Sequence, residues 1–144
     1  MKNIDLEKAK TELDAGEYTC VLALGESIYT STFRGVRPLV SWYESGLELC
    51  GYSAADKVVG KATAFLYILL GVRSLYASVI SRPALELLES AHIKIEYGTL
   101  TDNIINRAGD GICPFEAAVL DISTPEDAYA AILEKMRSMG ISLL

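Results

Sequence analysis

Asp56, Lys57 and Lys61 interrupt a largely hydrophobic stretch and are the first candidates for chemistry. Ser53 and Asp56 have the spacing of a capping box, so we expect a helix to begin at Ser53. Asp56 would then cap the helix, contact a ligand beside its positive end, or do both. Lys57 and Lys61 would share one face of this helix. A lysine on a buried helix needs a charged partner or a cleft.

Cys113 is the second candidate, because it comes directly before Pro114 at the expected start of a short helix. A thiol at a helix N-cap lies beside the dipole and its free amides, which favour the reactive thiolate. The alternative is a small packing residue without a chemical role. Asp56, Lys57 and Cys113 are therefore the candidate catalytic residues.

Polar residues and glycines gather in the segment 102–111, which includes Asn103, Asn106, Arg107 and Asp110. These residues suit a loop folded over a small polar ligand. Arg107 would bind a phosphate or carboxylate group of that ligand. The alternative is a loop held by its own Asx turns. The sequence favours neither interpretation over the other.

Composition restricts the partners that such sites could serve. The chain has 144 residues, of which 51% are hydrophobic, so we expect one domain over 1–144 with a packed core. Its net charge is −6, which argues against nucleic acid and against an anionic membrane surface. The longest apolar stretch, 62–72, is too short to span a bilayer.

The three cysteines, Cys20, Cys50 and Cys113, are widely spaced and form no C-x-x-C motif. We therefore expect a reducing cytoplasmic location, with Cys20 and Cys50 packed in the core. The amino terminus is too polar for a signal peptide. Because His92 is the single histidine, a histidine-based metal cluster is excluded. We expect no metal and no cofactor, and His92 at the solvent or the edge of the core.

Helix and strand patterns alternate along the chain. The patterns predict helices over 5–15, 38–45, 56–71 and 83–89, a short one from Pro114 and a last one from Pro125. They predict strands over 18–24, 27–32, 74–81 and 93–97, with an irregular segment over 98–111. Gly60, inside the third helix, would allow close approach of another backbone. This order predicts a three-layer α/β/α sandwich with a mixed sheet of four or five strands and a hairpin at one edge.

The segments DKVVGKA (56–62) and INRAGDGICPFEAAV (105–119) resemble an uncharacterised prokaryotic family, the domain of unknown function 1893. That family is similar in fold to the cytidine deaminases. The resemblance runs from the first hairpin to the final helix, and it implies a cytidine-deaminase-like arrangement of the α/β/α sandwich.

True deaminases open the central helix with H-x-E or C-x-E and the following helix with P-C-x-x-C, which supply the zinc ligands and the proton shuttle. Here the first place reads Ala55-Asp56-Lys57, and the second keeps one thiol, Cys113, with a carboxylate at Glu116. The resemblance therefore implies the fold without zinc-dependent deamination. It also implies that the two helix openings face each other, which makes Glu116 the expected partner of Lys57. Their pair is either structural or the charged wall of a pocket.

Three classes of function remain. The first is a protein that binds a small polar ligand, similar to a nucleoside or nucleotide, at the two helix openings. The second is an enzyme of unassigned chemistry that uses Asp56, Lys57 and Cys113. The third is an interaction subunit that forms a homo-oligomer by burying apolar helix faces. The predicted ligand-binding residues are Asp56, Lys57, Lys61, Asn103, Asn106, Arg107, Asp110, Cys113 and Glu116.

Overall fold

The computed structural model describes residues 3–33, 35–105, 109 and 111–141, which contain helices and strands in alternation. The helices are α1 (Ile4–Ala15), α2 (Arg37–Glu44), α3 (Lys61–Leu70), α4 (Arg82–Ser90), α5 (Pro114–Ala118) and α6 (Pro125–Ser138). The strands are β1 (Cys20–Leu24), β2 (Ser27–Ser31), β3 (Ser53–Val59), β4 (Ser74–Ser81) and β5 (Lys94–Thr101).

The strands form one mixed sheet in the order β2-β1-β3-β4-β5. β1 pairs antiparallel with both β2 and β3, whereas β3, β4 and β5 run parallel. Gly25 adopts a left-handed φ of 59° in the β1–β2 turn, which a two-residue hairpin of this kind requires. The predicted mixed sheet with an edge hairpin is confirmed.

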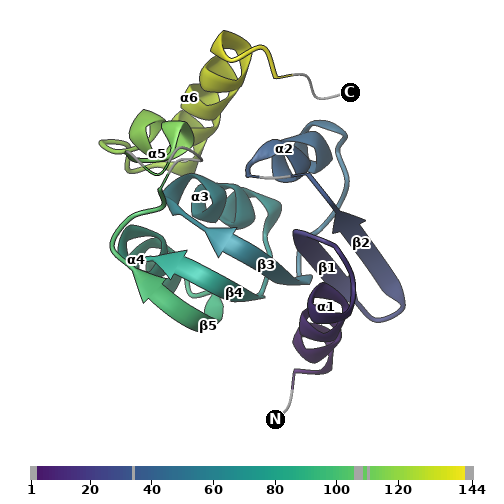
Figure 1. Cartoon of the computed structure of the whole chain (residues 1–144). Helices are drawn as coiled ribbons and strands as arrows, with labels where there is room; N and C mark the ends of the chain where they lie inside the picture. The colour runs from purple at the N-terminus through teal and green to yellow at the C-terminus, as the bar shows by residue number, and fades with distance from the viewer. Residues whose placement is uncertain (1–2, 34, 106–108, 110, 142–144) are drawn as a thin grey trace.

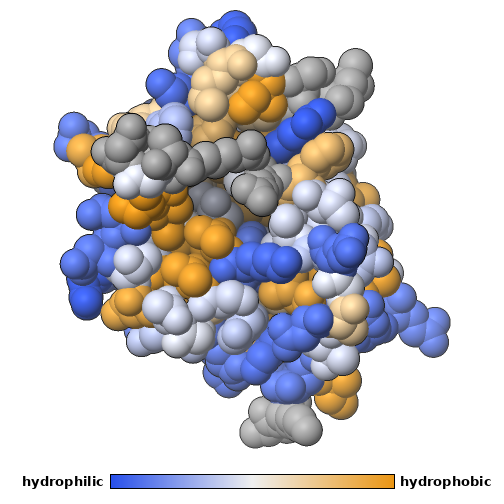
Figure 2. Space-filling model, viewed as in Figure 1, coloured by the Kyte–Doolittle hydropathy of each residue, from blue (hydrophilic) through white to orange (hydrophobic). Residues whose placement is uncertain are grey.

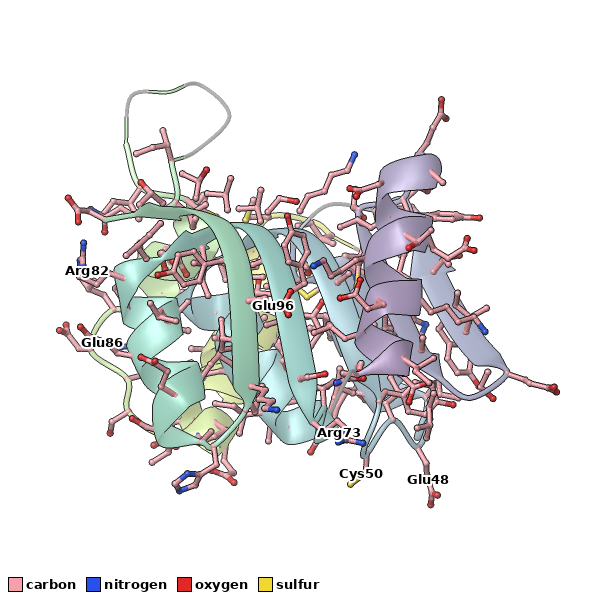
Figure 3. The ribbon with its side chains drawn as sticks, turned by 90° about the horizontal axis from the view of Figure 1, so that it is seen from below. Glu48, Cys50, Arg73, Arg82, Glu86 and Glu96 are labelled. Atoms are coloured by element: carbon pink, nitrogen blue, oxygen red, sulfur yellow. The ribbon has the colours of Figure 1, made fainter. Side chains whose placement is uncertain are left out.

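Helices cover both faces of this sheet (Figure 1). On one face, Ala9 and Leu13 of α1 pack against Val21, Ala23 and Ala55 in a small separate core. On the other face lie α2, α3 and α4, and α6 packs against α3 from outside. Figure 3 shows α1 in front of the β1 side of the sheet. Lys10 of α1 reaches across the sheet to Glu96 of β5, with 2.8 Å between its ammonium and the carboxylate. The predicted α/β/α layering is therefore confirmed, with α5 and α6 added beyond α3.

α3 is buried at the centre of the core and lies within the segment 56–71, over which the sequence predicts a helix. Phe65, Leu66 and Tyr67 are fully buried in the main core between the sheet and the helices. The helix ends at Gly71, whose φ of 79° is left-handed. No described helix is long and apolar enough to cross a membrane.

The predicted capping box at Ser53 and Asp56 is wrong, because both residues lie in strand β3. β3 is the central strand and forms ladders with β1 and β4 on its two sides. Its first four residues, Ser53 to Asp56, are buried whichever face they point to, so this part of its sequence lacks the alternation of a half-buried strand. Hydrogen bonding to two neighbours outweighs the local helix signal. The helix begins instead after Gly60, which is its N-cap rather than an interior residue.

Three smaller expectations also need correction. Lys57 and Lys61 do not share a helix face, because Lys57 lies in β3 and only Lys61 belongs to α3. Cys50 is exposed rather than packed in the core, whereas Cys20 is buried as expected. The last strand continues to Thr101, so the irregular segment begins later than Gly98.

Candidate functional site

Asp56, Tyr67 and Cys20 form a buried polar cluster where β3, α3 and β1 meet. The Tyr67 hydroxyl donates to Oδ2 of Asp56 at 2.6 Å, and Sγ of Cys20 lies 3.1 Å from the same hydroxyl. The backbone amide of Val58 donates to Oδ1 of Asp56 at 3.2 Å. Cys20 and Asp56 are partners in the β1–β3 ladder, which places their side chains on the same face of the sheet.

The electrostatics of this cluster follow from its burial. Asp56 is 8% exposed, and loss of hydration raises the pKa of its carboxyl group to about 7. The hydrogen bonds from Tyr67 and the backbone oppose this rise only in part. Burial, together with the Asp56 charge, also raises the pKa values of Tyr67 and Cys20 above their ordinary values. Asp56 is therefore the member of the cluster that titrates near neutral pH.

Glu116 lies at the amino end of α3 although it belongs to α5. Its carboxylate accepts hydrogen bonds from the backbone amides of Lys61 and Ala62, both at 2.9 Å. This acceptor fills the place of an N-cap side chain, which Gly60 cannot supply. A Cβ atom on Gly60 would lie 2.5 Å from the Glu116 carboxyl carbon. The glycine therefore permits close approach of a carboxylate rather than of another backbone.

The expected Lys57–Glu116 pair is wrong. Both carboxylate oxygens of Glu116 bind amides of α3, and no ion pair of Lys57 is found among the described residues. Lys57 is exposed, and its backbone amide donates to the Thr19 carbonyl. The Lys61 ammonium instead donates to the Leu120 carbonyl at 3.0 Å, just after α5.

The remaining predicted residues lie around α5 and the segment before it. Cys113 is the N-cap of α5, as expected, and is partly buried. Asn103 is exposed, and its carbonyl accepts a hydrogen bond from Thr101. Asn106, Arg107 and Asp110 lie outside the described residues. The structure thus brings Lys61 and Glu116 together, with Asp56 just before α3, but it places Asn103 at a separate exposed position.

Two adjoining hollows that sequence reasoning missed lie where β2 leads into α2. The larger, of about 360 Å³, is lined by Thr32, Phe33, Val36, Arg37, Phe115, Met136 and Ile141. The smaller, of about 150 Å³, is lined by Thr30, Ser31, Phe33, Arg37, Pro38, Ser41 and Trp42. We call them together the Arg37 groove, since Arg37 and Phe33 line both. The guanidinium carbon of Arg37 lies 4.2 Å from the centre of the Phe33 ring.

The sequence does carry one signal for this groove. Phe33 and Arg37 lie on either side of Gly35, directly before Pro38, at which a helix is expected to start. The Arg37 groove is joined to the buried cluster through Thr19. The Thr19 hydroxyl donates to the Phe33 carbonyl, and its own carbonyl accepts from the Lys57 amide, one residue after Asp56.

Hydrophobic side chains also gather on the surface near the carboxyl ends of β3, β4 and β5 (Figure 2). Val58, at the end of β3, is 45% exposed. Ile105 and Ile112, which form an antiparallel bridge, are also exposed. No group of three or more His, Cys, Asp or Glu side chains placed to hold a metal ion is found in the described part of the chain.

Comparison with known proteins gives the family. The family model described as domain of unknown function (DUF1893), TM1506, matches residues 8–136. The chain is also similar to the crystal structure of a DUF1893 family protein (TM1506) from Thermotoga maritima, with a TM-score of 0.86 and 28% sequence identity. That match covers 94% of this chain and 92% of the other. None of the curated proteins compared with the chain matches it. The extent of the family match shows that this chain is a member of the DUF1893 family.

Proposed function

We propose that the protein binds a small molecule with an anionic group and a flat apolar part, as a nucleotide has, in the Arg37 groove. The observation that carries this proposal is the shared lining of the two hollows, which combines one guanidinium with aromatic and aliphatic side chains. Ligand sites in proteins are concave, mostly apolar and oriented by a few polar groups. We keep the nucleotide-like ligand expected from the sequence, but we place it in the Arg37 groove rather than at the two helix openings.

Arg37 is the group proposed to bind the anionic part of the ligand. A guanidinium makes two parallel hydrogen bonds to a phosphate or carboxylate. Arg37 is also the first residue of α2, whose N-terminus has no side-chain cap, so the helix dipole adds to the positive potential. The amino end of α3 is less suited to this task, because the Glu116 carboxylate already accepts from two of its amides.

The apolar part of the ligand would contact the rings of Phe33 and Phe115 in the larger hollow. Offset stacking of a flat ring on an aromatic side chain contributes about 0.5–1.5 kcal/mol beyond the buried area. Trp42 lines the smaller hollow, and Thr32 lends a hydroxyl to the larger one.

Fluorescence of Trp42, the single tryptophan, offers a direct test of this proposal. The probes are a nucleoside 5′-monophosphate, the matching nucleoside and inorganic phosphate, each titrated into the full-length protein. We expect the monophosphate to bind most tightly, because it alone offers both parts of the ligand. Arg37→Gln should weaken its binding by about tenfold or more, which corresponds to about 1.4 kcal/mol.

Arg73→Gln is the matched control. Arg73 is exposed and directly precedes β4 (Figure 3). β2 and β4 run in the same direction, so the Arg37 groove, which follows β2, lies at the opposite end of the sheet. Its loss changes the net charge equally and should leave binding unchanged. If both arginine variants weaken binding alike, or if no probe changes the Trp42 signal, the groove is not the ligand site.

Self-association is the second candidate function, and the exposed hydrophobic residues Val58, Ile105 and Ile112 favour it. Ile112→Lys should then shift the mass measured by light scattering toward the monomer at high protein concentration. The enzyme reading has weaker support, because Asp56 and Lys57 are successive strand residues and point to opposite faces of the sheet.

A further inference from the structure

The cluster of Asp56, Tyr67 and Cys20 takes no part in the proposed ligand site, yet it holds three groups that can each carry a proton. All three side chains are buried. Tyr67 is in the middle, bonded on one side to the Asp56 carboxyl and on the other to the Cys20 thiol. The three side chains thus form one continuous chain of hydrogen bonds, with Tyr67 between Asp56 and Cys20.

The surroundings of Asp56 contain few other charges. β1 presents Cys20, α3 presents Tyr67, and β4 places Ala77, which cannot titrate, beside Asp56 in the ladder. On its own strand, Asp56 receives the Val58 amide, while the Lys57 side chain is exposed. At the nearby start of α3, Lys61 donates to a carbonyl and Glu116 accepts from amides. Among the described residues, Asp56 has no ion pair.

We propose that this chain of hydrogen bonds reverses its direction when Asp56 gains or loses a proton, so that the junction of β1, β3 and α3 responds to pH. With Asp56 ionised, the Cys20 thiol donates to Tyr67 and the Tyr67 hydroxyl donates to the carboxylate. With Asp56 protonated, its own hydroxyl donates to Tyr67, and the Tyr67 hydrogen turns toward the Cys20 sulfur. The proton of Asp56 is exchanged with solvent, and no other bond forms or breaks.

The two states differ in which contact is strong. A hydroxyl donating to a carboxylate is a charge-assisted bond, and the 2.6 Å distance between Tyr67 and Asp56 is typical of one. A hydroxyl donating to sulfur is weaker. Loss of the Asp56 proton therefore tightens the contact between α3 and β3 and changes the role of Cys20 from acceptor to donor. Because burial raises the pKa of Asp56 to about 7, this change falls in the neutral range.

Infrared spectroscopy of the protein observes both the Asp56 carboxyl group and the Cys20 thiol. The carbonyl stretching band of a protonated carboxyl group should persist in the folded protein at about pH 5.5, where exposed carboxyl groups are ionised. It should disappear with a midpoint near the pKa of Asp56. The S–H stretching band of Cys20 should shift with the same midpoint, because the thiol becomes a donor. Cys20→Ala identifies that band against those of Cys50 and Cys113.

Two variants test whether the Asp56 carboxyl group and the Cys20 thiol are coupled through Tyr67. Asp56→Asn should remove the carboxyl band and the pH dependence of the thiol band together. Tyr67→Phe should keep a protonated carboxyl group but uncouple the thiol band from pH, because the link between them is lost. The titration of the unaltered protein decides the matter even if these variants fail to fold. A thiol band that stays constant while the carboxyl band titrates contradicts the reversal, and the absence of any carboxyl band above about pH 5 contradicts the buried proton.

Discussion

Asp56 and Glu116 are both buried carboxyl groups, and they lie on either side of the turn that leads from β3 into α3. They are 8% and 9% exposed, respectively. Glu116 accepts two amide hydrogen bonds at the positive end of a helix, which compensate its negative charge. Asp56 accepts from one phenol and one amide within the core, with no ion pair found among the described residues.

The two carboxyl groups differ in the groups that replace the water they have lost. A helix N-terminus supplies several oriented amides, and it replaces the water that the carboxylate has lost. Asp56 also accepts two hydrogen bonds, but they come from a phenol and from the backbone of its own strand, without a helix dipole. The four experiments below test this contrast.

The largest expected effect is the pH dependence that Asp56 imposes on stability. Its folded-state pKa of about 7 lies above the ordinary aspartate value of 3.8, so the folded protein holds a proton that the unfolded chain releases. This stabilisation is present at low pH and is lost as pH rises through about 7. At about 1.36 kcal/mol per pKa unit, the loss between about pH 4 and pH 8 is on the order of 4 kcal/mol. Urea unfolding curves of the unaltered protein and of Asp56→Asn, recorded across this pH range, measure the loss. The asparagine side chain cannot ionise, so the variant should not show the pH dependence that Asp56 causes.

Parallel stability curves for Asp56→Asn and the unaltered protein across this range would remove Asp56 as the cause. We expect them instead to diverge as pH rises, with the asparagine variant favoured above about pH 7.

Leu66→Ala tests the purely apolar counterpart on the same helix. Leu66 is fully buried beside Tyr67, so its truncation should cost about 3 kcal/mol, within the usual range of about 2–5. Because no charge is involved, the loss measured in urea should be the same at low and high pH. A cost under about 0.5 kcal/mol would mean that α3 is not the centre of the core.

Glu116→Ala tests the other carboxyl group. Its removal leaves the amides of Lys61 and Ala62 without their acceptor, and we expect a loss of about 2 kcal/mol in thermal or urea unfolding. Glu134→Ala is the matched control, because Glu134 is an exposed glutamate of α6 in a surface pair with Arg137. The control should change stability by less than about 0.5 kcal/mol. Equal losses in the two variants would show that the cap contributes no more than a surface charge.

The smallest expected effect is the coupling between Lys57 and Glu116. Since both oxygens of Glu116 bind amides, Lys57→Met and Glu116→Gln should change stability additively, within about 0.5 kcal/mol. A double-mutant cycle gives this number directly. A coupling of about 1 kcal/mol or more would restore the ion pair that the resemblance implied and the structure lacks.

The sequence predicted the fold better than the site, and β3 shows why. The hairpin, β4 and α6 follow from local signals such as a turn glycine, β-branched runs and a proline at a helix start, and all are confirmed. β3 is central and its first four residues are buried on both faces, so they carry no alternation. Its small residues and Asp56 fit a helix start equally well.

The site depends on contacts between distant segments, which local patterns do not encode. Glu116 lies more than fifty residues from the amides that it caps. The Arg37 groove combines the start of α2 with Phe115, at the start of α5, and with residues near the carboxyl end of α6. The sequence selects Asp56 for a position at a helix start that it does not have. Of its actual partners, Cys20 is expected to serve packing alone, and no sequence pattern singles out Tyr67. The deaminase-like character of the fold stays a prediction.

The cap that Glu116 places on α3 also has a consequence for the order of folding. During synthesis α3 emerges before α5. The first amides of α3 therefore have no side-chain acceptor until Glu116, more than fifty residues later in the sequence, has been synthesised. Such a long-range contact closes a large loop and forms late in folding. We therefore expect the contacts of Glu116 to form after the folding transition state and to stabilise mainly the native structure. Its loss should speed unfolding and leave the folding rate almost unchanged.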